Sequence, residues 1–177
     1  MSEFTVQEIL TRMNELPRAV PALEEVLAIC ADNLPVILPE VGLPPPRSYG
    51  YVETEIDNAK FPALVVGASI RTDPAGHSYM DSSQVAVIYA FAGPRIAPED
   101  FRRSLDVAQV VRALLSLPTV VGPRYADDGT TIIWNTLLPA QQCFSPVPPN
   151  YPYFQGWQAA FMVDQYPVAG TLWPTQS

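Results

Sequence analysis

The distribution of proline is the feature of this sequence that most restricts how the chain can fold. The chain has 20 prolines in 177 residues, about twice the usual share of ~5%. Because proline fixes φ and lacks an amide hydrogen, it favours loops and the ends of helices and strands. Nine prolines stand at positions 35, 39, 44, 45, 46, 146, 148, 149 and 152. We therefore expect a single domain, 1–177, with extended proline-rich arms at 34–50 and 143–156 and an irregular tail at 167–177.

Two helices are predicted near the amino terminus. Thr5 and Glu8 have the spacing of a capping box, in which each side chain accepts a hydrogen bond from the other residue's amide. The helix that follows is expected to reach about Leu16, because apolar residues recur at helical spacing. These residues are Val6, Ile9, Leu10 and Met13. A second helix is predicted from about Pro21, a favourable first-turn residue, to Cys30.

A longer helix is predicted from about residue 98 to residue 117. Pro98 suits its first turn, and Glu99 and Asp100 complement the positive end of the helix dipole. Pro118 is expected to follow its end. Apolar residues recur along one face at Phe101, Leu105, Ala108, Val111 and Leu115. We expect this face to pack on a β-sheet.

The remaining apolar runs predict strands. They are Tyr51–Ile56, Phe61–Ile70, Gln84–Phe91, Thr119–Tyr125, Thr130–Leu138 and Gly156–Tyr166. The Gln84–Phe91 run is apolar on both faces, which is typical of a central strand covered on both sides. The pair Asp128-Gly129 favours a tight hairpin turn. Because strands and helices do not alternate regularly, the predicted fold is α+β, with a mostly antiparallel sheet rather than a doubly wound parallel one.

The charge balance excludes several kinds of partner. The net charge is −8, and Lys60 is the only lysine. A protein that binds nucleic-acid backbone needs many cations to displace counterions, and an anionic membrane surface attracts cations in the same way. No apolar run approaches the roughly 20 residues that span a bilayer. We therefore expect no specific nucleic-acid binding and no membrane association.

No group of residues predicts catalysis. Cys30 and Cys143 are far apart and belong to no Cys/His cluster, so we expect two buried free thiols and no metal or other cofactor. The run from Tyr125 to Asp128 matches the YxDD hairpin that holds Mg²⁺ in reverse transcriptases. In so short a chain it is better interpreted as a tight turn. His77 stands in a polar loop without a nucleophile motif, so the chain is not expected to be an enzyme.

The second arm is the strongest candidate for a contact with another protein. Five aromatic residues fall within fourteen positions: Phe144, Tyr151, Tyr153, Phe154 and Trp157. One interpretation is that they cover the subunit's own core. The other is a subunit or partner interface, because aromatic residues are enriched in interface cores and proline lowers the entropy lost when an arm is ordered.

The order of these elements resembles that of the tail terminator, or tail-completion, proteins in the neck of long-tailed bacteriophages. The similarity covers about Thr5 to Tyr166. It is carried by the amino-terminal helical segment, three of the predicted strands and the long helix. The segments are Val6–Ala31, Phe61–Val66, Gln84–Phe91, Asp100–Leu115 and Trp157–Val163. The high proline content and the two arms depart from the family's pattern.

The resemblance implies a structural virion protein rather than an enzyme. Such subunits form a ring, commonly six-fold, that ends the tail tube and joins it to the head connector, with a lumen through which DNA passes. They are assembled in the cytoplasm of the bacterial host. In a contractile tail the ring would also contact the sheath. A head-closure or stopper adaptor of the neck is the alternative within this context, and a small monomeric enzyme or ligand-binding domain is the alternative outside it.

Acidic loops fit a conduit for DNA, because negative charge repels phosphate. Four aspartates are candidates for the lumen or for a face of the ring: Asp73, Asp81, Asp127 and Asp128.

Overall fold

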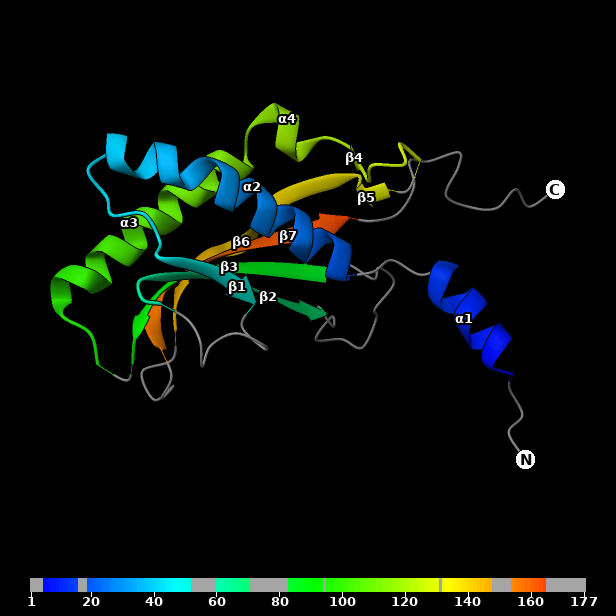
Figure 1. The fold of residues 1–177 in the computed structure, drawn as a ribbon, viewed down its shortest axis with the longest axis horizontal. Helices are drawn as coiled ribbons and strands as arrows, with labels where there is room; N and C mark the ends of the chain where they lie inside the picture. The colour runs from blue at the N-terminus through cyan, green and yellow to red at the C-terminus, as the bar shows by residue number, and fades with distance from the viewer. Residues whose placement is uncertain are drawn as a thin grey trace.

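A computed structural model of the chain describes residues 5–15, 19–51, 60–70, 83–93, 95–130, 132–147 and 154–164 (Figure 1). In chain order the helices and strands are α1 (Val6–Glu15), α2 (Ala19–Glu40), β1 (Ser48–Tyr51), β2 (Ala63–Ile70), β3 (Ser83–Ala92), α3 (Pro98–Leu115), α4 (Pro118–Val121), β4 (Arg124–Tyr125), β5 (Ile132–Trp134), β6 (Thr136–Pro146) and β7 (Phe154–Asp164). The predicted α+β fold is confirmed, and α3 is the long helix expected at about 98–117.

The main sheet is mostly antiparallel, as predicted. Its strand order is β1-β2-β3-β7-β6, and only the pairing of β1 with β2 is parallel. Strand β3 is central, with Val87 opposite Val66 of β2 on one side and Ala159 of β7 on the other. Strands β4 and β5 form a separate two-stranded sheet.

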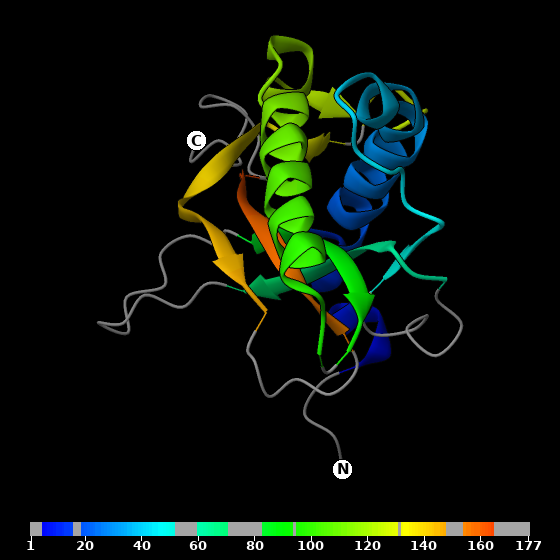
Figure 2. The ribbon, with the colours of Figure 1, turned by 90° about the vertical axis from the view of Figure 1, so that its left-hand side faces the viewer.

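Helices α2 and α3 lie next to each other on one face of the main sheet (Figure 2). Each contributes a buried stripe at helical spacing, which explains why both segments form helices there. In α2 this stripe is Ala22, Val26, Ile29, Cys30, Leu34 and Leu38, and in α3 it is Val107, Ala108, Val111, Leu114 and Leu115. Both stripes pack on Val85, Val87 and Tyr89, which alternate along one face of β3.

The opposite face of the sheet carries a second, smaller apolar cluster. It consists of Ala63, Val65, Ile88, Ala90, Val147 and Phe154, with Phe61 packed against it. Strand β3 thus buries side chains on both faces, as its sequence predicts.

The expected first arm, 34–50, is wrong at both ends, because α2 continues to Glu40, with Pro35 and Pro39 inside it, and β1 begins at Ser48. A proline inside a helix costs about 3 kcal/mol. Here both prolines are on the exposed side of α2, while Leu34 and Leu38 are wholly buried on the sheet. Burial of each leucine contributes about 1.5–3 kcal/mol, which offsets much of the cost of the prolines.

Helix α2 ends in a Schellman motif at Gly42. The Leu43 amide donates to the Leu38 carbonyl at 2.9 Å, and the Gly42 amide donates to Pro39 at 3.1 Å. Gly42 has a φ of 78°, a conformation that glycine adopts without strain. The Tyr89 hydroxyl then donates to the Pro44 carbonyl at 2.8 Å. These bonds hold the proline segment against the sheet.

The predicted strands on the carboxyl side of α3 also need correction. The strand predicted at Thr130–Leu138 is divided into β5, which ends at Trp134, and β6, which begins at Thr136 in the main sheet. The predicted strand Thr119–Tyr125 begins instead with helix α4, because Pro118 supplies the first turn of a new helix. Only Arg124 and Tyr125 form a strand, and it pairs with β5 through the predicted turn at Asp128-Gly129, where Gly129 has a φ of 73°.

The expected second arm, 143–156, is wrong at both of its ends. Residues up to Pro146 continue β6, and β7 begins at Phe154. Strand β6 lies at an edge of the sheet, where prolines are tolerated because an unpaired side needs no amide donor. Pro139 lies at a shift in register, and Pro146 is the last residue of the strand.

Candidate interaction surface

The two cysteine thiols are shielded from solvent. Cys30 and Cys143 are both buried and free, as the sequence predicts. Burial raises the pKa of the Cys30 thiol to about 12, so that thiol stays protonated at neutral pH. Within the described ranges, no three His, Cys, Asp or Glu side chains lie together as a metal site. Also within those ranges, no helix is both long enough and apolar enough to cross a membrane.

The predicted aromatic interface is divided between the two faces of the sheet. Phe144 and Trp157 are half-buried on the face that carries the helices, whereas Phe154 is 2% exposed in the smaller cluster. The Arg112 guanidinium lies 5.6 Å from the centre of the Phe144 ring, and the rings of Phe101 and Trp157 are 5.5 Å apart. Phe154 therefore packs in the core of its own subunit and is not available to a partner.

Tyr151 and Tyr153 lie outside the described residues. Contact between the arm and another subunit therefore stays a prediction, and among the described aromatic residues it concerns Phe144 and Trp157.

The predicted acidic surface is described only in part. Asp127 and Asp128 are exposed in the turn between β4 and β5. A carboxylate oxygen of Asp128 accepts a hydrogen bond from the Thr130 amide at 2.9 Å, which stabilises the turn. Asp73 and Asp81, like His77, lie outside the described residues. The turn presents negative charge to solvent, and its position relative to a lumen stays a prediction.

Helix α1 exposes the apolar residues that recur at helical spacing in its sequence. Val6 is 73% exposed, Ile9 51% and Leu10 47%. Their i, i+3, i+4 spacing places them on one side of the helix. Figure 1 shows α1 standing away from the sheet, beyond the first turn of α2. Single exposed apolar residues are common, but three on one turn indicate a contact surface.

The start of α1 is fixed by the predicted capping box. The Thr5 amide donates to the Glu8 carboxylate at 2.7 Å, and the Glu8 amide donates to the Thr5 hydroxyl at 3.2 Å. The Thr5 hydroxyl also donates to the same carboxylate at 2.8 Å. These bonds favour the ionised carboxylate, so they lower the pKa of Glu8 below its ordinary value.

A Thr5→Ala substitution is therefore expected to raise the pKa of Glu8. Because the folded pKa is the lower one, the capping contribution is present above the ordinary glutamate pKa and is lost as the pH falls through the lowered value. Titration of the Glu8 carboxyl carbon by NMR would measure this. In the variant, Glu8 keeps only the hydrogen bond from the amide of residue 5. The midpoint of the Glu8 titration should therefore move towards that of an ordinary glutamate. Identical midpoints in the two proteins would contradict the hydrogen bond from the Thr5 hydroxyl to the Glu8 carboxylate.

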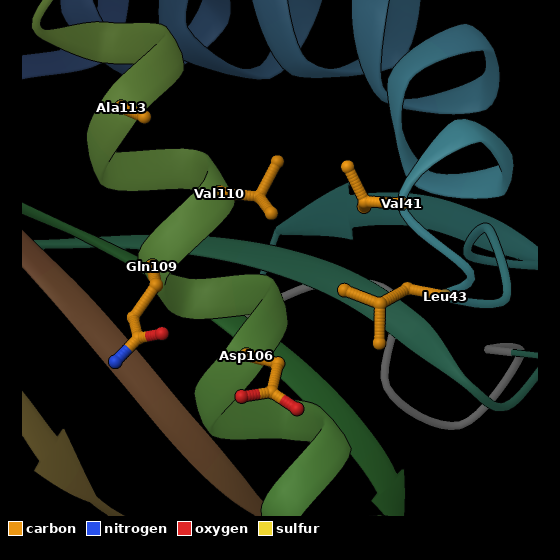
Figure 3. Close-up of a pocket in the computed structure, with 6 residues that line it drawn as sticks. All are labelled: Val41, Leu43, Asp106, Gln109, Val110 and Ala113. Atoms are coloured by element: carbon orange, nitrogen blue, oxygen red, sulfur yellow. The ribbon is translucent and has the colours of Figure 1, made fainter.

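A second apolar surface is an open groove between α3 and the chain that leaves α2 (Figure 3). It encloses about 360 Å³. Its lining residues are Val41, Leu43, Asp106, Gln109, Val110 and Ala113. In Figure 3, Val41 and Leu43 point from one wall towards Val110 on the other, with Asp106 and Gln109 towards one end. The Schellman motif builds this groove, because it turns the chain at Gly42 and directs Leu43 back towards α3.

Sequence reasoning missed the groove and the exposure of the α1 stripe. The apolar spacing in α1 was visible in the sequence, but spacing cannot distinguish a stripe that packs on its own sheet from one left uncovered.

Comparison with known proteins adds no assignment: no known protein family matches the chain, and no curated protein is detectably similar to it.

Proposed function

We propose that this protein is a structural subunit of the neck of a long-tailed bacteriophage, forming the ring that terminates the tail tube and joins it to the head connector. The observation that carries the proposal is the pair of uncovered apolar surfaces, the α1 stripe and the groove beside α3. A subunit that acts alone gains nothing from leaving three apolar side chains on one turn in water. A ring subunit covers them with its neighbours.

The fold and charge are consistent with this role. The α+β arrangement, with a long helix following the central strand, has the element order on which the resemblance to tail terminators rests. The net charge of −8 and the exposed Asp127 and Asp128 suit a passage that DNA crosses without binding. In this role the ring acts within the virion, and its partners are the tail tube, the head connector and, in a contractile tail, the sheath.

Electron microscopy of particles assembled without this protein tests the proposal. We expect full heads together with tails that are overlong or not joined to heads, because a terminator stops tube growth and supplies the joint. Heads that leak DNA beside tails of normal length would instead indicate the stopper adaptor. Normal, joined particles would contradict any role in the neck.

A further inference from the structure

We infer that helix α1 of one copy docks into the groove between α3 and the Val41–Leu43 turn of a second copy. This inference rests on the proposed function, because it assigns the contact that would hold neighbouring ring subunits together. The segment that enters the groove is α1 of a second, identical copy, and every copy has both the helix and the groove.

The two surfaces match in chemistry and size. Val6, Ile9 and Leu10 offer the i, i+3, i+4 anchors with which an amphipathic helix enters an apolar groove. The groove offers apolar side chains on both walls, from Leu43 and Val110 among others. From Asp106 to Ala113 it follows α3 for seven residues, or about 10 Å at 1.5 Å per residue. The ten residues of α1 span about 15 Å, so two turns of α1 fit along it.

The same chain's α1 does not fill this groove. Helix α2 has 22 residues and is therefore about 33 Å long, and the groove lies at its carboxyl end. Figure 1 shows α1 beyond the amino-terminal end of α2, at the opposite end of the molecule from the carboxyl end of α2. The groove of one copy is therefore open to α1 of a second copy.

This contact is compatible with a ring. The donating surface and the accepting surface are different parts of the chain, so one copy can donate α1 to one neighbour and accept α1 from another. Such head-to-tail contacts close into a ring when the rotation between copies closes, whereas a reciprocal exchange of α1 between two copies would give a two-fold dimer.

Disulfide trapping tests the contact directly. Two single variants, Ile9→Cys and Ala113→Cys, would be purified apart, mixed under reducing conditions and then oxidised. Cys30 and Cys143 are buried in the native chain and serve as the background control. We expect a disulfide-linked dimer in the mixture, formed between the two variants, and a ladder of linked copies when one chain carries both substitutions.

The matched control replaces Ala113→Cys by Leu138→Cys. Leu138 is 49% exposed on β6, away from the groove. Equal trapping with Leu138→Cys, or no trapping with Ala113→Cys, would overturn the docking of α1 into the groove.

Measuring assembly without a cross-link distinguishes a failure of this inference from a failure of the proposed function. Leu10→Gln keeps helix propensity but removes an anchor, and Leu138→Gln changes a side chain of similar exposure elsewhere. By mass photometry, Leu10→Gln should raise the concentration needed for assembly by about tenfold, and Leu138→Gln should not change it. Assemblies unaffected by Leu10→Gln would overturn the α1 contact and leave the ring intact. A native chain that stays monomeric at every concentration would overturn both.

Discussion

Replacing Trp134 by alanine is expected to lower the free energy of unfolding by about 3–5 kcal/mol. Trp134 is wholly buried at the end of β5, and its indole N–H donates to the Val120 carbonyl at 2.9 Å. The Arg124 guanidinium lies 6.0 Å from the centre of its ring. The side chain thus joins β5, α4 and β4 to the core beneath α2. Alanine would leave a cavity and an unpaired carbonyl, and these two costs add.

Urea unfolding followed by circular dichroism would measure this loss. Trp134→Phe should lose less than Trp134→Ala, because it keeps most of the ring volume, although it also removes the hydrogen bond to Val120. Leu138→Ala, at an exposed position of β6, should stay within about 0.5 kcal/mol of the native protein. A loss below about 1 kcal/mol for Trp134→Ala would contradict the packing of this region.

Gly156→Ala is expected to be nearly as damaging, although it adds a single methyl group. A Cβ atom at Gly156 would lie 2.2 Å from the carbonyl oxygen of Tyr89 and 3.2 Å from its carbonyl carbon. Gly156 pairs with Ala90 in the ladder between β3 and β7. Because the obstacle is main chain at the centre of the sheet, no rotamer change relieves it. We expect a loss of about 3 kcal/mol, at the upper end of the usual range for overpacking.

Thermal unfolding would show this as a fall in Tm of about 6–12 °C for a chain of this length. Gly122→Ala provides the control, since its Cβ would meet the Pro118 carbonyl oxygen at an ordinary 3.5 Å and its φ of −73° suits alanine. That variant should unfold within about 2 °C of the native protein. Equal Tm values for Gly156→Ala and Gly122→Ala would show that β3 and β7 are not packed as described.

Local sequence patterns predicted the parts of the fold in which one physical preference dominates. Strand β3 carries apolar residues on both faces and proved central, with Val87 on one side of the sheet and Ile88 on the other. The proline and acids at the start of α3, together with its apolar stripe, were sufficient to predict that helix. The Asp128-Gly129 turn was likewise determined by residues within it.

Prediction was wrong where tertiary burial outweighs a local preference. Pro35 and Pro39 disfavour a helix, but the burial of Leu34 and Leu38 on the sheet extends α2 past both prolines. Gly42 was the available signal for the true end of α2, because glycine commonly follows the last turn of a helix. The edge position of β6, which accommodates Pro139, depends on the order of strands and could not be deduced from the residues around it.

The candidate site was the least predictable part of the molecule. Its groove brings Val41 and Leu43 next to Val110, which is more than sixty residues away in the chain, so only the tertiary arrangement creates it. The aromatic residues that seemed to form one interface are instead divided by the sheet, because Phe144 and Phe154 face opposite sides of it.

Native mass spectrometry of the purified chain, combined with negative-stain electron microscopy of the same sample, tests the central claim most directly. We expect a closed assembly whose mass is a whole-number multiple of 19.4 kDa, seen as an annulus with a central opening. A single species of 19.4 kDa at every concentration, or a compact dimer without an opening, would contradict the proposal that this protein is a ring subunit.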